Sequence, residues 1–493
     1  MSHLSRRQFL EESMLTAAAA AAVGGTPLAT FAQVEKQSTS PNEKLAIATI
    51  GVNGQGSAHL QEFTKRKDVD LVAICDADSR VGNRKCEEVE RRTGRRPKYV
   101  QDLRELFDDK SINCISTATP NHWHALVAIW AMQAGKDVYV EKPVSHNVSE
   151  GRRIVQVARK LGRICQTGTQ CRSMKGTIDA IEYMQAGKIG EVNLARGLCY
   201  KRRPSIGSRK EVKVPDSVDY NLWTGPAPLK PSYRNGDKGP IHYDWHWFWD
   251  YGNGDLGNQG IHQMDIARWG LGVDTVSPAV LSYGGRFGYK DAGETANTQV
   301  IIHDYGPKTL VFEVRGLVTD KLKGAGVGVI FEGTDGYVVL TAYDEGAAFD
   351  KNGQEIERFT GGSYGHHFAN FIKAVRSRKH DDLNADILQG HLSSALCHTG
   401  NISYRLGEET SLEEVKARLS TAKSADKNLE TLERTIAHLK DNDVEINGQT
   451  RLRLGPRLEM DPQTETFASN SDANAMLTRD YRAPFVVPTA DKV

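Results

Sequence analysis

The stretch KLAIATIGVNGQGSAHLQEF, residues 44–63, decides the fold of the first part of the chain. An apolar, β-branched run leads into a glycine-rich turn, and a helical spacing of apolar residues follows. Gly51 and Gly56 hold the outer positions of a G-x-G-x-x-G loop, but Asn53 stands at the middle position and Gly54 comes one residue later. Asparagine tolerates a positive φ better than other non-glycine residues, so we expect the loop to survive this exchange.

The next segment, VDLVAICDADSR, supplies a second apolar strand that ends at Asp76, 20 residues after Gly56. Strand, loop, helix, strand and acid in this order are typical of a dinucleotide-binding fold, in which a helix N-terminus favours the charge of the diphosphate. An acid at this strand end can bind both ribose hydroxyls and would repel a 2′-phosphate. Asp76 therefore predicts NAD, and the nearby Arg80 keeps NADP as an alternative.

Composition excludes several other classes of protein. The chain has 493 residues, 25% of them charged, and a net charge of +1, so no strong field favours nucleic acid or an anionic membrane. Its seven cysteines form no C-x-x-C pair and no spacing typical of a metal site. The length predicts at least two domains.

The N-terminus predicts export. Arg6 and Arg7 stand before a weakly apolar, alanine-rich stretch, which is typical of a twin-arginine signal peptide covering residues 1–32. An ordinary secretory signal or a retained anchor is the alternative. A polar linker follows at residues 33–44. The twin-arginine route carries folded proteins to the periplasm, so such a protein can acquire its cofactor in the cytoplasm. Folding in that reducing compartment also explains cysteines without disulfide pairing.

Two later motifs carry a resemblance to a known family. ATPNHWH (residues 118–124) and AGKDVYVEKP (residues 134–143) resemble the glucose–fructose oxidoreductase/inositol dehydrogenase (Gfo/Idh/MocA) family, and the region at residues 245–272 extends the similarity. The resemblance covers roughly residues 45–407 and implies an α/β fold. It consists of an N-terminal Rossmann domain and a C-terminal α/β domain with a large open, mainly antiparallel sheet.

We place the Rossmann domain at residues 45–165 and the substrate domain at 166–407. Strand-like runs between residues 278 and 333 follow one another with no helix between them, which indicates a meander. The open face of such a sheet could pair with a second copy, so we expect a homo-oligomer. Residues 408–493 are expected to be an arm over the body or a neighbouring subunit, with a disordered tail as the alternative.

The resemblance also implies a set of site residues. Lys142, from E-K-P, would hold the reacting oxygen, and His262 would be the general base. Asn258 stands where the family commonly has aspartate, four residues before His262 and on the same face of an expected helix. Asp255 is a candidate replacement for that acid. The residues expected to bind the cofactor are Gly51, Asn53, Gly54, Gln55, Gly56, Asp76, Thr119, Pro120, His124, Glu141, Lys142 and Gln170.

The segment IHYDWHWFWDYG, residues 241–252, interleaves aromatic rings with polar groups, which suits sugar rings. His242 and His246 could alternatively bind a metal, but no third ligand follows at a recognisable spacing, so we expect no metal. In the basic stretch KRRPSIGSRK (residues 201–210), Lys201 could meet an acidic sugar. The residues expected to contact the substrate are Arg172, Lys201, Trp245, His246 and Asp265, although Asp265 could equally be a helix-face acid.

Together these features predict an exported NAD(P)-dependent oxidoreductase that acts on a sugar, a sugar derivative or a cyclic polyol. Free NAD is scarce outside the cytoplasm, so we expect a tightly held cofactor that one substrate reduces and another reoxidises. One alternative is an NAD-assisted glycosidase, in which transient oxidation acidifies a C–H bond and permits elimination. Another is a carbohydrate-binding protein on the same fold, suggested by Asn53 and Asn258.

Overall fold

A computed structural model describes residues 43–233, 239–422 and 424–493. The predicted signal peptide, residues 1–32, and nearly all of the predicted linker lie outside these ranges. Within the described ranges, no helix is both long enough and apolar enough to cross a membrane.

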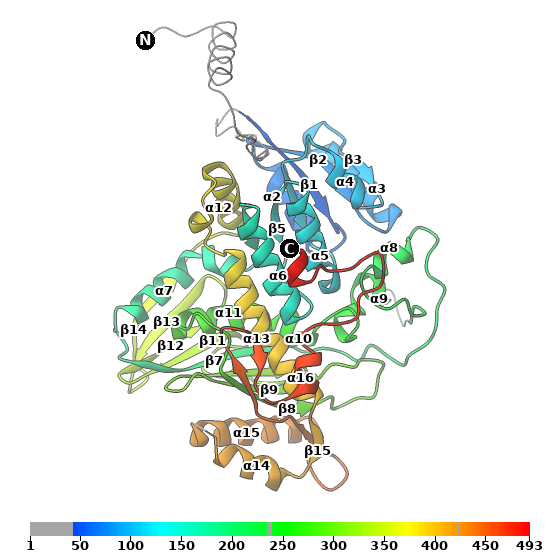
Figure 1. The fold of residues 1–493 in the computed structure, drawn as a ribbon. Helices are drawn as coiled ribbons and strands as arrows, with labels where there is room; N and C mark the ends of the chain where they lie inside the picture. Colours follow the sequence, from blue (N-terminus) through cyan, green and yellow to red (C-terminus); the bar gives the residue numbers. More distant parts are fainter. Residues whose placement is uncertain (1–42, 234–238, 423) are drawn as a thin grey trace, which may run out of the picture. The chain divides into compact units, whose positions relative to one another are not determined.

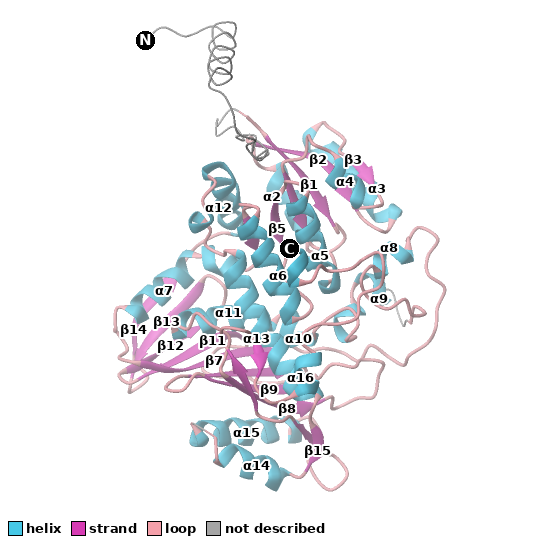
Figure 2. Cartoon of the chain, in the orientation of Figure 1, coloured by secondary structure: helices cyan, strands magenta, loops and turns pink. Residues whose placement is uncertain are grey.

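The N-terminal domain is a parallel six-stranded sheet with the order β3-β2-β1-β4-β5-β6, which is the strand order of a dinucleotide-binding fold. Figures 1 and 2 show its helices on both faces. The strands are β1 (Leu45–Ile50), β2 (Val69–Cys75), β3 (Lys98–Val100), β4 (Cys114–Thr117), β5 (Asp137–Val140) and β6 (Cys165–Thr167). The helices are α2 (Gly56–Thr64), α3 (Ser79–Thr93), α4 (Arg104–Asp108), α5 (Asn121–Gln133) and α6 (Val148–Lys160).

The C-terminal domain is built on a twelve-stranded mixed sheet, mostly antiparallel, in which β10 and β7 pair in parallel. The path runs β14-β13-β12-β11-β7-β10-β9-β8-β16-β15, and β17 and β18 join beside β8. Its strands are β7 (Val192–Tyr200), β8 (Ala279–Gly285), β9 (Thr298–Asp304), β10 (Thr309–Arg315), β11 (Val327–Gly333), β12 (Gly336–Leu340), β13 (Glu345–Asp350), β14 (Glu355–Thr360), β15 (Glu408–Thr410), β16 (Leu452–Leu454), β17 (Leu458–Asp461) and β18 (Thr466–Phe467). Of the predicted meander, β8, β9 and β10 are consecutive neighbours, but β7 lies between β10 and β11, so the prediction was wrong at its last strand.

Helices cover both faces of this sheet (Figure 1). One face carries α7 (Lys175–Gln185), α11 (Gly260–Leu271) and α13 (Ile387–Arg405), whose apolar residues join those of the strands in one core. On the other face, α14 (Leu412–Ser420) and α15 (Ala425–Lys440) bury leucines against β8, β9 and β10. This hairpin therefore occupies part of the face considered above for pairing with a second copy.

The two domains interlock more than the predicted boundary at residue 165 suggests. Strand β6 extends beyond it to Thr167. Helix α12 (Tyr364–Ser377), far along the chain, packs Phe368 and Phe371 against Ile47 and Tyr139 of the Rossmann sheet. The interface between the domains is thus part of a continuous core.

A long connection between β7 and α10 (Gly254–Asn258) reaches across to the Rossmann domain. We call its described parts, residues 201–233 and 239–253, the roof segment. It contains α8 (Tyr220–Thr224), α9 (Gly239–His242) and the short 3-10 helix η2 (Asp244–Trp247). Its backbone is hydrogen-bonded to the start of α3: Ser79 N donates to Ser217 O at 2.8 Å, and Asp219 N donates to Ala77 O at 2.9 Å.

Most of the extension predicted at residues 408–493 is folded, as β15 to β18, α14, α15 and α16 (Ser471–Ala475). Residues 476–493 form an arm that runs past α8 towards α6 (red in Figure 1). The Arg482 guanidinium donates to the Asn221 carbonyl at 2.8 Å, to the Asn221 side chain at 2.6 Å and to the Gly225 carbonyl at 3.0 Å. The Phe485 ring packs edge-on against Trp123 of α5, 5.4 Å between centroids. The arm thereby joins the roof segment to the Rossmann domain.

Candidate active site

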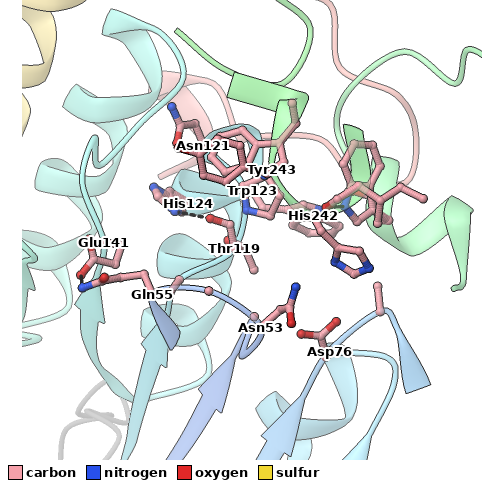
Figure 3. A pocket seen from close by; sticks show the side chains of 18 of the residues that line it. Asn53, Gln55, Asp76, Thr119, Asn121, Trp123, His124, Glu141, His242 and Tyr243 are labelled. Atoms are coloured by element: carbon pink, nitrogen blue, oxygen red, sulfur yellow. Dashed lines mark hydrogen bonds between the residues drawn. The ribbon is translucent and has the colours of Figure 1, made fainter. Parts of the chain in front are cut away.

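A cavity of about 350 Å³ lies between the carboxyl ends of the Rossmann strands and the roof segment. Figure 3 shows Asp76 and His242 at one end of it, and Gln55 and Glu141 at the other. The predicted site residues on its wall are Gly51, Asn53, Gly54, Gln55, Asp76, Thr119, Pro120, His124, Glu141, Lys142, Lys201, Trp245, His246 and Asn258.

The glycine loop fits a nucleotide diphosphate. Gly51 has φ +77°, and a Cβ there would lie 2.8 Å from Thr119 N; a Cβ on Gly56 would lie 1.9 Å from Gly51 O. Gly54 is different, because a Cβ there would meet nothing within 4 Å. Gly54 thus leaves the cavity open beside the N-terminus of α2, where backbone N–H groups favour an anion.

Asn53 does not need the conformation that we expected for it, because its φ is not positive. Its side-chain oxygen accepts a hydrogen bond from Arg84 Nη2 at 3.1 Å. The close-approach position of the loop is therefore Gly54, one residue later than in the common motif, and Asn53 instead links the loop to α3.

Asp76 closes the opposite end of the cavity. Its carboxylate oxygens accept hydrogen bonds from Val52 N at 2.9 Å and Asp78 N at 3.0 Å, which fix the carboxylate at the strand end. Burial raises the pKa of Asp76, while these two N–H groups and the nearby His242 oppose the rise. Arg80, which kept NADP open, is mostly exposed and lies 3.6 Å from Asp78.

Replacing Asp76 with alanine should shift nucleotide preference towards NADP, because it removes both the acceptor for ribose hydroxyls and the charge that repels a 2′-phosphate. We expect the NAD-to-NADP ratio of bound nucleotide to fall by roughly 10- to 100-fold. Mass spectrometry after equilibration with an equimolar mixture measures it. Asp70→Ala, on the same strand but paired outward with Arg95, is the control. An unchanged ratio in Asp76→Ala would remove Asp76 from cofactor selection.

Glu141 lies on the cavity wall and bonds two neighbouring side chains. Its Oε1 lies 3.1 Å from His59 Nε2 and accepts from Gln55 Nε2 at 3.3 Å. Although burial opposes ionisation, the hydrogen bond from His59 and the charge of Lys142 hold the pKa of Glu141 at about 2. Glu141 therefore carries a permanent negative charge beside Lys142.

Lys142 reaches across to the second domain, where its Nζ donates to the backbone carbonyl of Asn258 at 3.0 Å. Burial lowers the pKa of Lys142; the charges of Lys201 and Arg203 add to this, and Glu141 opposes it. An ammonium group with a lowered pKa can hold a substrate oxygen and also release a proton.

His246 contributes an oriented ring. Its Nδ1 lies 2.5 Å from the Tyr243 carbonyl, which can only accept, so Nδ1 carries the proton and Nε2 keeps its lone pair. The ring stacks on Trp245, with centroids 3.6 Å apart. Burial lowers the pKa of His246 to about 3; the Tyr243 carbonyl and a hydrogen bond with the Asn258 side chain oppose this, and Lys142 adds to it.

His262 lies outside the cavity wall and is buried next to Tyr343, 5.0 Å between ring centroids. Its Nδ1 is buried without a hydrogen-bond partner, so that nitrogen does not orient the ring. Burial, with the charge of Lys142, lowers its pKa well below the usual value. The expected helix carrying both Asn258 and His262 is interrupted at Gln259, between α10 and α11.

Four other predicted residues lie off the wall. Arg172 donates to Asp265 through Nε at 2.7 Å and Nη2 at 2.9 Å, and this buried pair ties η1 (Gln170–Ser173) to α11. Gln170 is buried in the same short helix, and Gly56 packs against Gly51. Arg172 and Asp265 therefore bond each other away from the cavity wall, and the substrate contact expected of them stays a prediction.

Hydrogen bonds and an ion pair between polar side chains fix the part of the cavity wall that the second domain supplies. Arg203 binds Asp255 through Nε at 2.9 Å and Nη2 at 2.6 Å, and donates to the Tyr243 hydroxyl at 3.0 Å. This pairing gives Asp255 a partner of its own, away from Lys142. Gln259 accepts from Lys201 Nζ at 3.0 Å and donates to the Tyr343 hydroxyl at 2.6 Å.

His124 lines the cavity, but both of its ring nitrogens meet backbone carbonyls, Pro143 O at 2.6 Å and Thr119 O at 2.7 Å (Figure 3). It holds the Thr119–Pro120 turn against the E-K-P segment. His122 contacts the Trp223 carbonyl at 3.1 Å instead of the cavity. The ATPNHWH segment is helical from Asn121 onward, which explains why the two rings diverge.

Family models match both domains. Residues 45–169 match the NAD-binding Rossmann fold of the GFO_IDH_MocA oxidoreductase family, and residues 192–439 match the C-terminal α/β domain of that family. The chain belongs to the Gfo/Idh/MocA oxidoreductase family. Its N-terminal domain is accordingly an NAD-binding Rossmann fold of that family.

Solved structures and curated proteins extend the comparison. The chain is similar to levoglucosan dehydrogenase in complex with NADH and levoglucosan (18% identity, TM-score 0.55, covering 72% of this chain and 95% of that one). It is also similar to the WlbA dehydrogenase from Bordetella pertussis in complex with NADH and UDP-GlcNAcA (19%, TM-score 0.53, covering 72% and 94%). These identities show a shared fold.

Two curated relatives carry hydrolase names. An alpha-N-acetylgalactosaminidase from Shewanella oneidensis is 29% identical over 154 residues, 30% of this chain and 34% of that protein. A glycosyl hydrolase family 109 protein from Shewanella sp. (strain ANA-3) is 28% identical over 205 residues, 39% and 45%. The chain thus spans less than half the length of these relatives.

Sequence reasoning missed several wall residues of this Gfo/Idh/MocA protein. Tyr243 and His242 lie within the aromatic stretch at residues 241–252, but the sequence does not show which part of the cavity each one lines. In the structure, His242 Nε2 lies 3.2 Å from Asp78 Oδ2, at the Asp76 end of the cavity. Gln259 and Arg203 gave no signal, because a glutamine at a helix junction and an arginine in a basic loop are common surface residues.

Proposed function

We propose that the protein keeps NAD bound and transfers a hydride between it and a carbohydrate hydroxyl. The observation that carries this proposal is that the roof segment of the second domain contacts the Rossmann domain beside Asp76, the acid expected to bind the ribose. Solved dehydrogenases of the same fold with NADH and a sugar ligand support the carbohydrate.

We expect the cofactor to be retained because several hydrogen bonds between the roof segment and its neighbours must break before the cavity can open. The roof backbone pairs with Ala77 and Ser79, and His242 reaches Asp78. The arm then bonds the roof again through Arg482. Because these contacts must open together, we expect slow release of the nucleotide.

The protein residues have distinct tasks in this proposal. When bound, NAD supplies the acceptor or donor of the hydride. Lys142 holds the reacting oxygen, and the Nε2 lone pair of His246 accepts its proton. Asn258 positions Lys142 through its carbonyl, and its side chain lies next to His246. His262 is the alternative acceptor predicted from the sequence.

The first test is the nucleotide content of the purified mature protein. We expect about one NAD(H) per chain after denaturation, measured by mass spectrometry. Sugars added one at a time to this holoenzyme should reduce the bound cofactor in a single turnover, and a second carbohydrate should reoxidise it. Weak retention with turnover on external NAD would overturn the retained-cofactor proposal.

Arg482→Ala should speed cofactor release by at least roughly 10-fold, because the roof loses the guanidinium that bonds Asn221 and Gly225. Exchange of bound NAD for an isotopically labelled pool measures the rate. Arg451→Ala, whose guanidinium donates to the nearby Gly448 carbonyl away from the roof segment, is the matched control. Equal exchange in both variants would show that the arm does not hold the roof.

A second candidate is a glycosidase that uses the same hydride transfer transiently. It is favoured by the curated relatives named alpha-N-acetylgalactosaminidase and glycosyl hydrolase family 109. Holoenzyme incubated with aryl glycosides, N-acetylgalactosaminides included, distinguishes the two. Multiple-turnover release of the phenol without any acceptor supports the glycosidase, and a single stoichiometric reduction of NAD supports the oxidoreductase.

We propose further that the protein is exported through the twin-arginine route, on the strength of Arg6 and Arg7 before an alanine-rich stretch. Fractionation of the native host should find the mature chain in the periplasm, carrying NAD. Replacing both arginines with lysine should retain it in the cytoplasm. Export of that double variant would contradict this route.

A further inference from the structure

Two ammonium groups on the cavity wall have no carboxylate partner within ion-pair distance among the described residues. Lys142 Nζ donates to the carbonyl of Asn258, and Lys201 Nζ donates to the side-chain oxygen of Gln259. Because these acceptors belong to consecutive residues, the two positive groups lie on the same part of the wall. Because the acceptor of Lys201 is a neutral amide, Lys201 brings a positive charge to this region that its own hydrogen bond does not compensate.

The acids of the wall leave Lys201 without a partner. Asp76 lies at the opposite end of the cavity near His242 (Figure 3), and His242 contacts Asp78. Glu141 lies beside Lys142 and bonds His59 and Gln55, so it offsets part of the charge of Lys142 and not that of Lys201. The remaining cation, Arg203, is already neutralised by Asp255.

The cofactor offers no partner for Lys201 at this place. The glycine loop and the N-terminus of α2 provide the diphosphate site on the Rossmann domain, whereas Lys201 lies at the end of β7 in the second domain. An oxidised nicotinamide ring carries positive charge itself. A ligand group that enters beside Lys142 and Lys201 would therefore be stabilised by a negative charge.

We propose that the substrate is an acidic carbohydrate, whose carboxylate or sulfate group pairs with Lys201 while the reacting hydroxyl lies at Lys142. The proposal rests on the proposed function and adds the substrate class. Lys201 lines the cavity and is also exposed to solvent, as is the adjacent Arg202. Exposed positive groups beside a cavity attract an anion before it binds.

The test compares matched substrates on the holoenzyme: methyl glucuronides and galacturonides, the corresponding neutral glycosides, and 6-sulfated glycosides. Reduction of bound NAD gives kcat/KM, and titration calorimetry gives binding without turnover. We expect the wild-type protein to prefer the acidic member of a pair. In Lys201→Met the acid-to-neutral ratio should fall by roughly 10-fold or more, as for loss of a hydrogen bond to a charged group.

Lys213→Met is the control, because Lys213 lies on the same segment but is highly exposed and pairs with Asp216. The control should keep the wild-type ratio, and thermal melting should show both variants folded. Uronides and sulfates distinguish the two sources of negative charge. Equal kcat/KM and equal affinity for acidic and neutral members would overturn the proposal, even if both reduce NAD. Uronide binding that needs Lys201 without any NAD reduction would support the site and overturn the proposed reaction.

Discussion

His246→Ala is expected to slow reduction of the bound cofactor by roughly 100- to 10,000-fold, the usual loss when a positioned proton acceptor is removed. Nucleotide content should stay near the wild-type value, because His246 lies on the second-domain side of the cavity, away from the glycine loop. Stopped-flow absorbance of the reduced nicotinamide measures the single-turnover rate.

The matched comparison is His262→Ala, which removes the acceptor predicted from the family motif. His246 has an orienting partner in the Tyr243 carbonyl, whereas His262 Nδ1 has none, so we expect the smaller effect at His262. If His262→Ala abolishes reduction and His246→Ala does not, the motif-based assignment holds instead.

The pH dependence follows from the lowered pKa of His246. A ring with a pKa of about 3 stays neutral, and able to accept a proton, at every pH above that value. The rate should therefore show no histidine step between about pH 8 and pH 5. A step near the ordinary histidine pKa that disappears in His246→Ala would contradict this environment.

Gly54→Val should leave the protein nearly free of nucleotide. A Cβ at this position meets nothing within 4 Å in the protein, so the fold tolerates it, but the isopropyl group would stand in the cavity where the diphosphate must approach the loop. Nucleotide content after purification, with the melting temperature alongside, measures the effect.

Two other glycines make this a controlled experiment. Gly448→Val, in a surface loop with equally open surroundings, should keep its nucleotide. Gly51→Ala should instead destabilise the protein, because its φ is +77° and its Cβ would press on Thr119 N. A full complement of NAD in Gly54→Val would show that the diphosphate lies elsewhere.

The fold was predictable where local pattern and long-range pairing agree. The apolar runs at residues 45–50 and 69–75 became neighbouring parallel strands, and the runs at residues 278–315 became the neighbouring strands β8, β9 and β10. The insertion of β7 between β10 and β11 was not predicted. Packing between distant segments was not predictable, because no local pattern marks that α12 returns to the Rossmann core or that α14 and α15 cover the sheet.

The candidate site was likewise predictable where local motifs define it, and not where distant segments meet. Motifs located Gly51, Asp76 and Lys142, whose roles depend on backbone geometry that adjacent residues encode. The partners of Arg172 and Asp265 come from separate elements, and an ion pair between them cannot be read from either segment alone. The sequence likewise did not predict that Asn258, which stands where the family commonly has aspartate, lies next to His246.

The arm also bears on resistance to proteolysis. Arg482 and Phe485 fasten residues 476–493 to the roof segment and to α5, so a protease can cut the arm only after these contacts open. Under the proposed function the same opening releases the nucleotide, so bound NAD should slow cleavage of the arm.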